Sequence, residues 1–142
     1  MSFQWQFDFR KIRAGIYVLS GEPDEVGKPR TYKIGYTLNI KRRVNSYHIL
    51  YPKGVYTIGF LLLDRKKHLT RWLPGKIECW QVLQKMNSRL AEKLGINEGW
   101  HSNMSKEAVI AALVAVHEEF SEDTDYPCTD IYRPLYSEYT YH

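Results

Sequence analysis

The chain has 142 residues, enough for one domain with its own hydrophobic core. Hydrophobic residues make up 44% and charged residues 25%, which is typical of an ordinary globular protein. No apolar run approaches the roughly 18 residues of a membrane span, and no apolar segment follows a basic N-terminus, so we expect neither a membrane protein nor a secreted one.

The net charge of +4 hides an uneven distribution of charge along the chain. Residues 1–76 hold 15 Lys and Arg against 5 Asp and Glu, whereas residues 77–142 hold 5 against 11. A basic first half is typical of proteins that bind a polyanion by neutralising its phosphates. A solvated surface of mixed charge is the alternative reading.

The two cysteines and five histidines form no metal motif and no disulfide framework. Cys79 and Cys128 therefore favour an intracellular, reducing environment.

The first half of the chain predicts two strands and a helix. Residues 15–20 (GIYVLS) are rich in β-forming residues, and residues 31–37 (TYKIGYT) repeat that character after a loop with Gly, Pro and Asp. The two segments are expected to pair antiparallel. Asn39 is placed to cap a helix that runs to about Leu50.

The second half predicts one more strand, two helices and a tail. Residues 55–64 read as a buried strand, and a helix is expected from Pro74 to Leu94, stopped by Gly95. Residues 96–103 read as a loop. Ser105 is placed to cap a helix over residues 106–120.

The order β-β-α-β-α-α predicts an α+β fold with a three-stranded antiparallel sheet flanked by helices. We expect one domain over residues 1–120. Residues 121–142 are acidic and rich in tyrosine, and we expect an extended tail that lies on the domain or on a partner.

Alternation along the two N-terminal strands predicts which side chains share a face of the sheet. Tyr17 and Leu19 share one face of the first strand, and Lys33 and Gly35 share one face of the second. Tyr32 lies opposite Lys33. In the following helix, Ile40, Val44 and Tyr47 form the buried stripe.

The same helical spacing separates two arginines. Arg43 falls at the margin of the buried stripe, close to the sheet, and Arg42 falls on the solvent side. A guanidinium held at Arg43 can clamp a phosphate at two points, or it can form a salt bridge between helix and sheet.

Three acidic residues are candidates for a metal-binding role. Glu78 lies in the first turns of the long helix, on the flank of its buried stripe, where a negative charge also suits the helix dipole. Its alternative role is structural, and Asp64 and Glu98 are rivals.

Taken in order, these residues resemble the GIY-YIG nuclease superfamily, and most closely its branch in phages and large DNA viruses, whose second motif often reads YKIG-T. The resemblance covers residues 14–103. It rests on an ordered set of residues: Gly15, Ile16, Tyr17, Ile34, Gly35, Thr37, Arg43, Tyr47 and Glu78.

The resemblance implies an endonuclease that hydrolyses phosphodiester bonds with one divalent ion, Mg²⁺ or Mn²⁺. Tyr17 matches the tyrosine of the first motif, Arg43 the phosphate-binding arginine and Glu78 the metal ligand. The expected substrate is DNA, although the sequence does not separate DNA from RNA. Further contacts with the nucleic acid are expected from Lys41, Arg42, Tyr47, Arg65, Lys66 and Lys67.

One position departs from the family pattern, because Lys33 stands where the second motif has its tyrosine. Lys33 either holds a phosphate or accepts a proton in place of that tyrosine, or it marks a site that has lost its chemistry. The alternative function is therefore a degenerate DNA-binding or structural protein, such as a component of a virion or a complex. In that case the N-terminal segment and the C-terminal tail are the expected docking arms for a protein partner.

Overall fold

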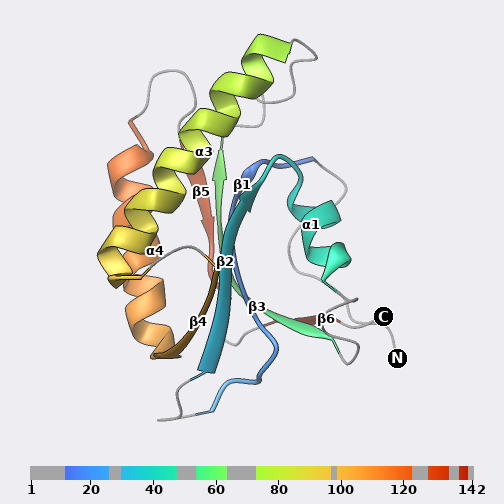
Figure 1. Ribbon diagram of the computed structural model, residues 1–142, viewed down its shortest axis with the longest axis vertical. Helices are drawn as coiled ribbons and strands as arrows, with labels where there is room; N and C mark the ends of the chain where they lie inside the picture. The colour runs from blue at the N-terminus through green and yellow to red at the C-terminus, as the bar shows by residue number, and fades with distance from the viewer. Residues whose placement is uncertain are drawn as a thin grey trace.

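The computed structural model describes residues 12–25, 30–47, 54–63, 73–96, 99–122, 128–134 and 138–140. These residues form an α+β fold, in which one antiparallel sheet separates two unequal layers of helices (Figure 1).

The three predicted strands form the centre of the sheet. They are β1 (Gly15–Ser20), β2 (Arg30–Thr37) and β3 (Val55–Leu63), and β1 lies between the other two with antiparallel pairing on both sides. Both central pairings join segments that are rich in aromatic and β-branched residues, as expected for strands that are buried on both faces.

The sheet also has three strands that the sequence analysis did not predict. β4 (Gly99–Met104) pairs with β2, whereas β5 (Cys128–Tyr132) and β6 (Glu138–Thr140) both pair with β3. The prediction of a loop over residues 96–103 is therefore wrong for residues 99–103, which belong to β4. Its Gly and Asn argue against a strand locally, but the free edge of β2 supplies a hydrogen-bonding partner.

The tail is extended, as expected, and its described parts lie on the domain. Both β5 and β6 come from residues 121–142, so these parts of the tail complete the sheet of residues 1–120. An ion pair of 2.7 Å between Arg13 and Asp130 further joins the tail to the segment before β1.

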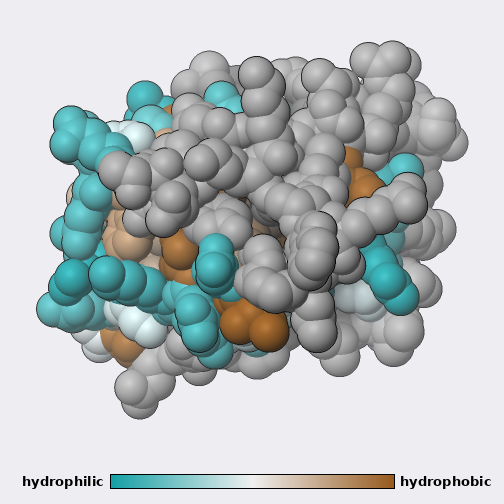
Figure 2. All heavy atoms as spheres, turned by 90° about the horizontal axis from the view of Figure 1, so that it is seen from above, coloured by the Kyte–Doolittle hydropathy of each residue, from teal (hydrophilic) through white to brown (hydrophobic). Residues whose placement is uncertain are grey.

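The helices lie on opposite faces of the sheet. α3 (Leu73–Leu94) and α4 (Lys106–Phe120) cover one face, and α1 (Ile40–Ser46) covers the other (Figure 1). In the view from above, hydrophilic residues gather on the side where α3 and α4 lie (Figure 2). The three helices begin or end where the sequence indicates: Asn39 and Ser105 act as N-caps, and Gly95 adopts a positive φ of 67° directly after α3.

Two hydrophobic clusters correspond to the two faces. The larger cluster joins Ile16, Val18, Tyr32 and Ile34 to the buried stripes of α3 and α4, which include Cys79, Leu83, Met86, Leu90, Val109 and Leu113. The smaller cluster joins Tyr17, Leu19, Phe60 and Leu62 to Ile40, Val44 and Tyr47 around α1. The predicted alternation of Tyr17 and Tyr32 between faces is thus confirmed.

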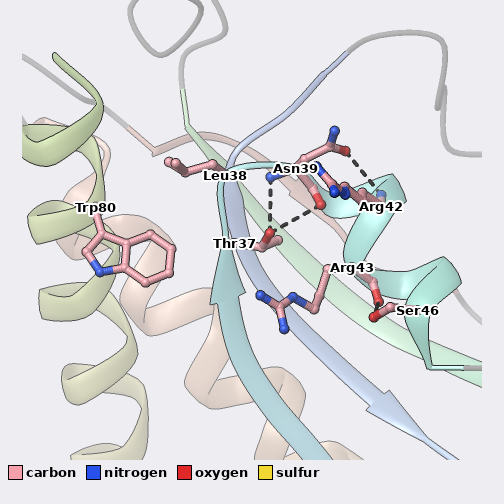
Figure 3. Close-up of a pocket in the computed structure, with 7 residues that line it drawn as sticks. All are labelled: Thr37, Leu38, Asn39, Arg42, Arg43, Ser46 and Trp80. Carbon is pink, nitrogen blue, oxygen red and sulfur yellow. Dashed lines mark hydrogen bonds between the residues drawn. The ribbon is translucent and has the colours of Figure 1, made fainter. Parts of the chain in front are cut away.

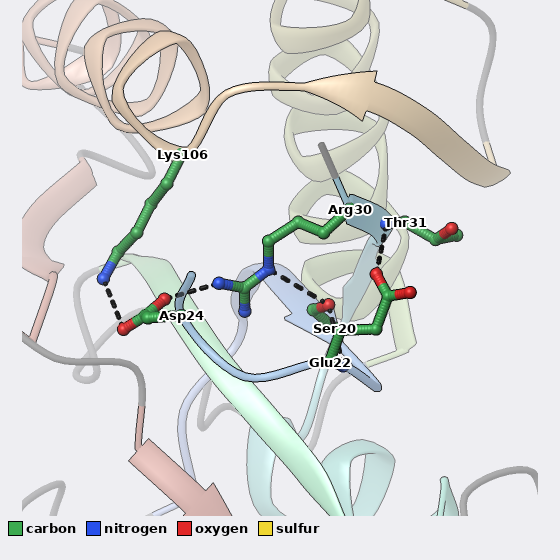
Figure 4. Close-up of polar contacts among 6 residues, drawn as sticks. All are labelled: Ser20, Glu22, Asp24, Arg30, Thr31 and Lys106. Atoms are coloured by element: carbon green, nitrogen blue, oxygen red, sulfur yellow. Dashed lines mark hydrogen bonds and ion pairs between the residues drawn. The ribbon is translucent and has the colours of Figure 1, made fainter. Parts of the chain in front are cut away.

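The loop between β1 and β2 is tied down by a polar network at the first residue of β2. Arg30, only 6% exposed, forms an ion pair with Asp24 and donates to Ser20 Oγ at 3.3 Å (Figure 4). Its guanidinium also lies over the Tyr32 ring. Asp24 also accepts from Lys106 at the start of α4, at 3.0 Å. The network therefore anchors a long loop to both the sheet and a helix.

Among the residues that the structure describes, no helix is both long and apolar enough to span a bilayer.

Candidate functional site

The face of the sheet that carries α1 brings several of the predicted site residues together. Tyr17 lies opposite Gly35 in the antiparallel register, and Leu19 lies opposite Lys33. Directly paired residues share a face, so Tyr17, Lys33 and Gly35 all lie on the side of α1. The sequence-based expectation that Lys33 stands beside Tyr17 therefore agrees with the register.

Gly35 has a specific steric role beneath Tyr17. A Cβ atom at position 35 would overlap the Tyr17 hydroxyl and lie 2.6 Å from its Cζ. The phenol ring therefore lies across the backbone of β2, where only a residue without a side chain leaves room for it. This contact gives a physical reason for a glycine opposite the tyrosine of the first motif.

Tyr17 forms a pair with Tyr47, the last residue of the predicted buried stripe. Their hydroxyls are 3.0 Å apart, and their ring centroids are 5.9 Å apart. Both rings are buried, with 3% and 6% of their surface exposed. Burial, followed by the hydrogen bond to Tyr47, raises the pKa of Tyr17 above its ordinary value of 10.0, while the nearby Arg43 guanidinium lowers this pKa to a lesser degree. Tyr17 is therefore protonated at neutral pH.

A pocket of about 430 Å³ opens where β2 passes into α1 (Figure 3). Its lining residues are Thr37, Leu38, Asn39, Arg42, Arg43, Ser46 and Trp80. The pocket thus combines one end of β2, the exposed side of α1 and one side chain from α3.

The floor of the pocket is held by local hydrogen bonds. Asn39 N donates to Thr37 Oγ1 at 3.1 Å, and Thr37 Oγ1 donates to the carbonyl of Asn39 at 3.2 Å. The Asn39 side chain accepts from Arg42 N at 3.1 Å, and Ser46 Oγ donates to the carbonyl of Arg43 at 2.6 Å. These bonds fix the turn from which both arginines project.

Arg42 and Arg43 both line the pocket, and both are exposed. Arg42 is exposed, as expected for the solvent side of the helix, and it also lines the pocket together with Arg43. Within the described residues, no carboxylate forms an ion pair with either guanidinium. The salt bridge considered for Arg43 is thus not found there, and two cations face the same space.

Glu78 does not join this group. α3 covers the face opposite Tyr17, and Glu78 is exposed on that helix. At 100° per residue, Glu78 lies within about 20° of Arg89, which forms an ion pair with Glu119 of α4. Trp80, which lines the pocket, projects about 160° away from Glu78. Glu78 is therefore exposed on α3 and is not among the lining residues of the pocket.

The metal that the family resemblance implies does not fit the described residues of this pocket. Magnesium prefers oxygen ligands, carboxylates above all, and none of the seven lining residues carries one. Asp64 and Glu98, the rivals of Glu78, lie outside the described residues, as do Arg65, Lys66 and Lys67. Lys41 is exposed on α1.

The sequence analysis missed Trp80 as a site residue. It follows Cys79 of the buried stripe and packs against Tyr36, with ring centroids 4.7 Å apart. A large aromatic residue at the margin of an amphipathic stripe was the available signal. Its contribution to the pocket depends on the position of α3 over β2, which local spacing does not indicate.

Comparisons with known proteins found no match to this chain among protein-family models, curated proteins or solved structures. The similarity to GIY-YIG nucleases is therefore a resemblance of motifs in the sequence.

Proposed function

We propose that this chain is a DNA endonuclease of the GIY-YIG type that holds the phosphodiester backbone through Arg43. The observation that carries the proposal is the meeting of Tyr17, Tyr47 and Arg43 at one end of the sheet, with Gly35 making room for Tyr17.

The chemistry assigned to Arg43 is electrostatic. An exposed guanidinium without a described carboxylate partner is available to a phosphate, to which it can donate two parallel hydrogen bonds. Hydrolysis adds negative charge to the phosphoryl oxygens, and a positioned cation stabilises that charge. Arg42 lines the same pocket and supports binding of the backbone.

Tyr17 acts in this proposal as a neutral hydroxyl, because its raised pKa keeps its proton in place at neutral pH. In a pair of hydroxyls, one proton joins the two oxygens and the second remains for another acceptor. Tyr17 and Tyr47 can therefore orient a water molecule or relay a proton. No step is assigned to a metal, although a divalent ion remains part of the proposal through the family resemblance.

The decisive experiment is nicking of supercoiled plasmid by the purified chain, in Mg²⁺ and in EDTA. We expect nicking only in Mg²⁺, reduced about 100-fold by Tyr17→Phe because a positioned proton donor is removed. Glu78→Ala tests the ligand that the resemblance implies, with Glu122→Ala as a control at an exposed glutamate at the end of α4. Equal nicking by the wild type, Tyr17→Phe and Glu78→Ala would identify a contaminating nuclease.

A second function, binding of DNA without cleavage, is favoured by three observations. Lys33 replaces the second-motif tyrosine, Tyr17 is buried against Tyr47, and none of the described residues that line the pocket is a carboxylate. Retarded migration of DNA on a gel, with no nicking under any metal condition, would support this function.

A further inference from the structure

The pocket beside α1 has two chemically different walls. Arg42 and Arg43 project from α1, and the indole of Trp80 projects from α3 on the opposite face of the sheet (Figure 3). The first wall is cationic and the second is a flat aromatic surface. A ligand that satisfies both walls carries an anion and a planar ring on one compact unit.

Trp80 is held in place before any ligand arrives. Its ring packs against Tyr36 of β2 at an interplanar angle of 57°, and it is only partly buried. An indole fixed on one side loses little conformational freedom when a ring stacks on its remaining surface. The wall is therefore preorganised for stacking.

The size and charge of the pocket agree with a nucleotide. Its volume of about 430 Å³ lies within the range of pockets that hold small ligands, roughly 300–1,000 Å³. Among its described lining residues there are two arginines and no carboxylate, which favours an anionic ligand. Phosphate suits the arginines, and a base suits the indole.

Bases inside a duplex are stacked on their neighbours and cannot present a ring face to a protein side chain. Stacking on Trp80 therefore requires an unpaired base. We propose that this pocket binds one unpaired nucleotide of a DNA strand, with its base against Trp80 and its phosphate on Arg42 and Arg43. This inference rests on the proposed function and adds a preference for DNA with a gap, flap or single-stranded end.

The test is fluorescence anisotropy in EDTA, where metal-dependent cleavage is prevented. Two labelled DNA probes are compared, a blunt duplex and the same duplex with a short single-stranded thymidine extension. The variants are Trp80→Phe, which keeps an aromatic ring, and Trp80→Leu, which keeps apolar packing against Tyr36 but cannot stack. Thermal unfolding checks that both variants are folded.

We expect the wild type to bind the extended probe at least about fivefold more tightly than the blunt one, since stacking on one aromatic residue contributes a factor of this size or more. Trp80→Phe should keep most of that ratio. Trp80→Leu should bring the ratio close to one while binding of the blunt duplex is unchanged.

A wild-type ratio of one, or an unchanged ratio in Trp80→Leu, would overturn the inference. Arg43→Ala separates this failure from failure of the proposed function. If Arg43→Ala binds the blunt duplex as tightly as the wild type, the assigned phosphate contact is wrong, whatever the two Trp80 variants show.

Discussion

The two ends of β2 each carry an arginine, and the two arginines have opposite environments. Arg30 begins the strand, is 6% exposed and contacts Asp24 and Ser20 (Figure 4). Its guanidinium also lies over the Tyr32 ring. Arg43 follows the other end of the strand, is exposed and lines an open pocket with a second arginine (Figure 3). One cation is neutralised inside the protein, and the other faces solvent beside a like charge.

This difference shows why the residue type alone does not reveal the role of a cation. Arg30 stabilises the fold, because its buried charge is paired and its loop is connected to α4 through Asp24 and Lys106. Arg42 and Arg43 are both exposed and line one pocket, so a bound phosphate can accept hydrogen bonds from either guanidinium. The first position is expected to govern stability, and the second to govern binding.

The largest expected effect is on stability at the Arg30 end. Arg30→Leu leaves Asp24 with Lys106 as its remaining cation and frees the loop. We expect a loss of about 2–3 kcal/mol in the free energy of unfolding, below the usual cost of breaking a buried pair because Asp24 is 29% exposed. Arg43→Leu should change the free energy of unfolding by less than about 0.5 kcal/mol. Urea denaturation of both variants is the measurement, and equal losses would abolish the distinction between the two ends of β2.

A smaller effect is expected from pH, because burial raises the pKa of two thiols and two phenols in the described part of the chain. Burial raises the pKa of Cys79 to about 11 and that of Cys128 to about 12, and it raises the pKa values of Tyr17 and Tyr32 above their ordinary value. The unfolded chain loses these protons first as pH rises, since its thiols and phenols keep their ordinary pKa values of about 9 and 10. The stability contributed by the protonated groups is therefore present below pH 9 and is lost progressively above it.

Tyr17→Phe should weaken this alkaline loss, which urea midpoints measured from about pH 8 to about pH 11 can detect. An alkaline loss in Tyr17→Phe that equals the wild-type loss would mean that Tyr17 does not contribute to it.

The central fold was predictable from local patterns. The strands around Tyr17, Lys33 and Phe60, the caps at Asn39 and Ser105, and the stop at Gly95 all depend on neighbours in the sequence. The outer strands β4, β5 and β6 depend on tertiary pairing: they contain turn-forming or polar residues and are strands because they hydrogen-bond to the edges of β2 and β3. The local sequence pattern carries little information about pairing between distant segments.

The residues of the candidate site also fall into those that local patterns predicted and those that depend on tertiary packing. Strand alternation and helical spacing placed Tyr17, Tyr47 and Arg43 on one face, and the structure has them together. The position of α3 could not be read from periodicity, because a stripe shows which side of a helix is buried but not which face of the sheet it covers. That missing step explains both the unexpected presence of Trp80 in the pocket and the placement of Glu78 on a helix that covers the face opposite Tyr17.

The most direct test of the Arg43 end as a phosphate-binding site is the salt dependence of affinity for a blunt DNA duplex. Arg43→Ala should weaken binding and reduce the slope of log affinity against log salt by about one, as expected for one lost phosphate contact. The control is Lys85→Ala, an exposed cation on α3 that does not line the pocket, and it should retain the wild-type slope. Wild-type affinity and slope in Arg43→Ala would contradict the account, because Arg43 would then carry no part of the contact with the DNA backbone.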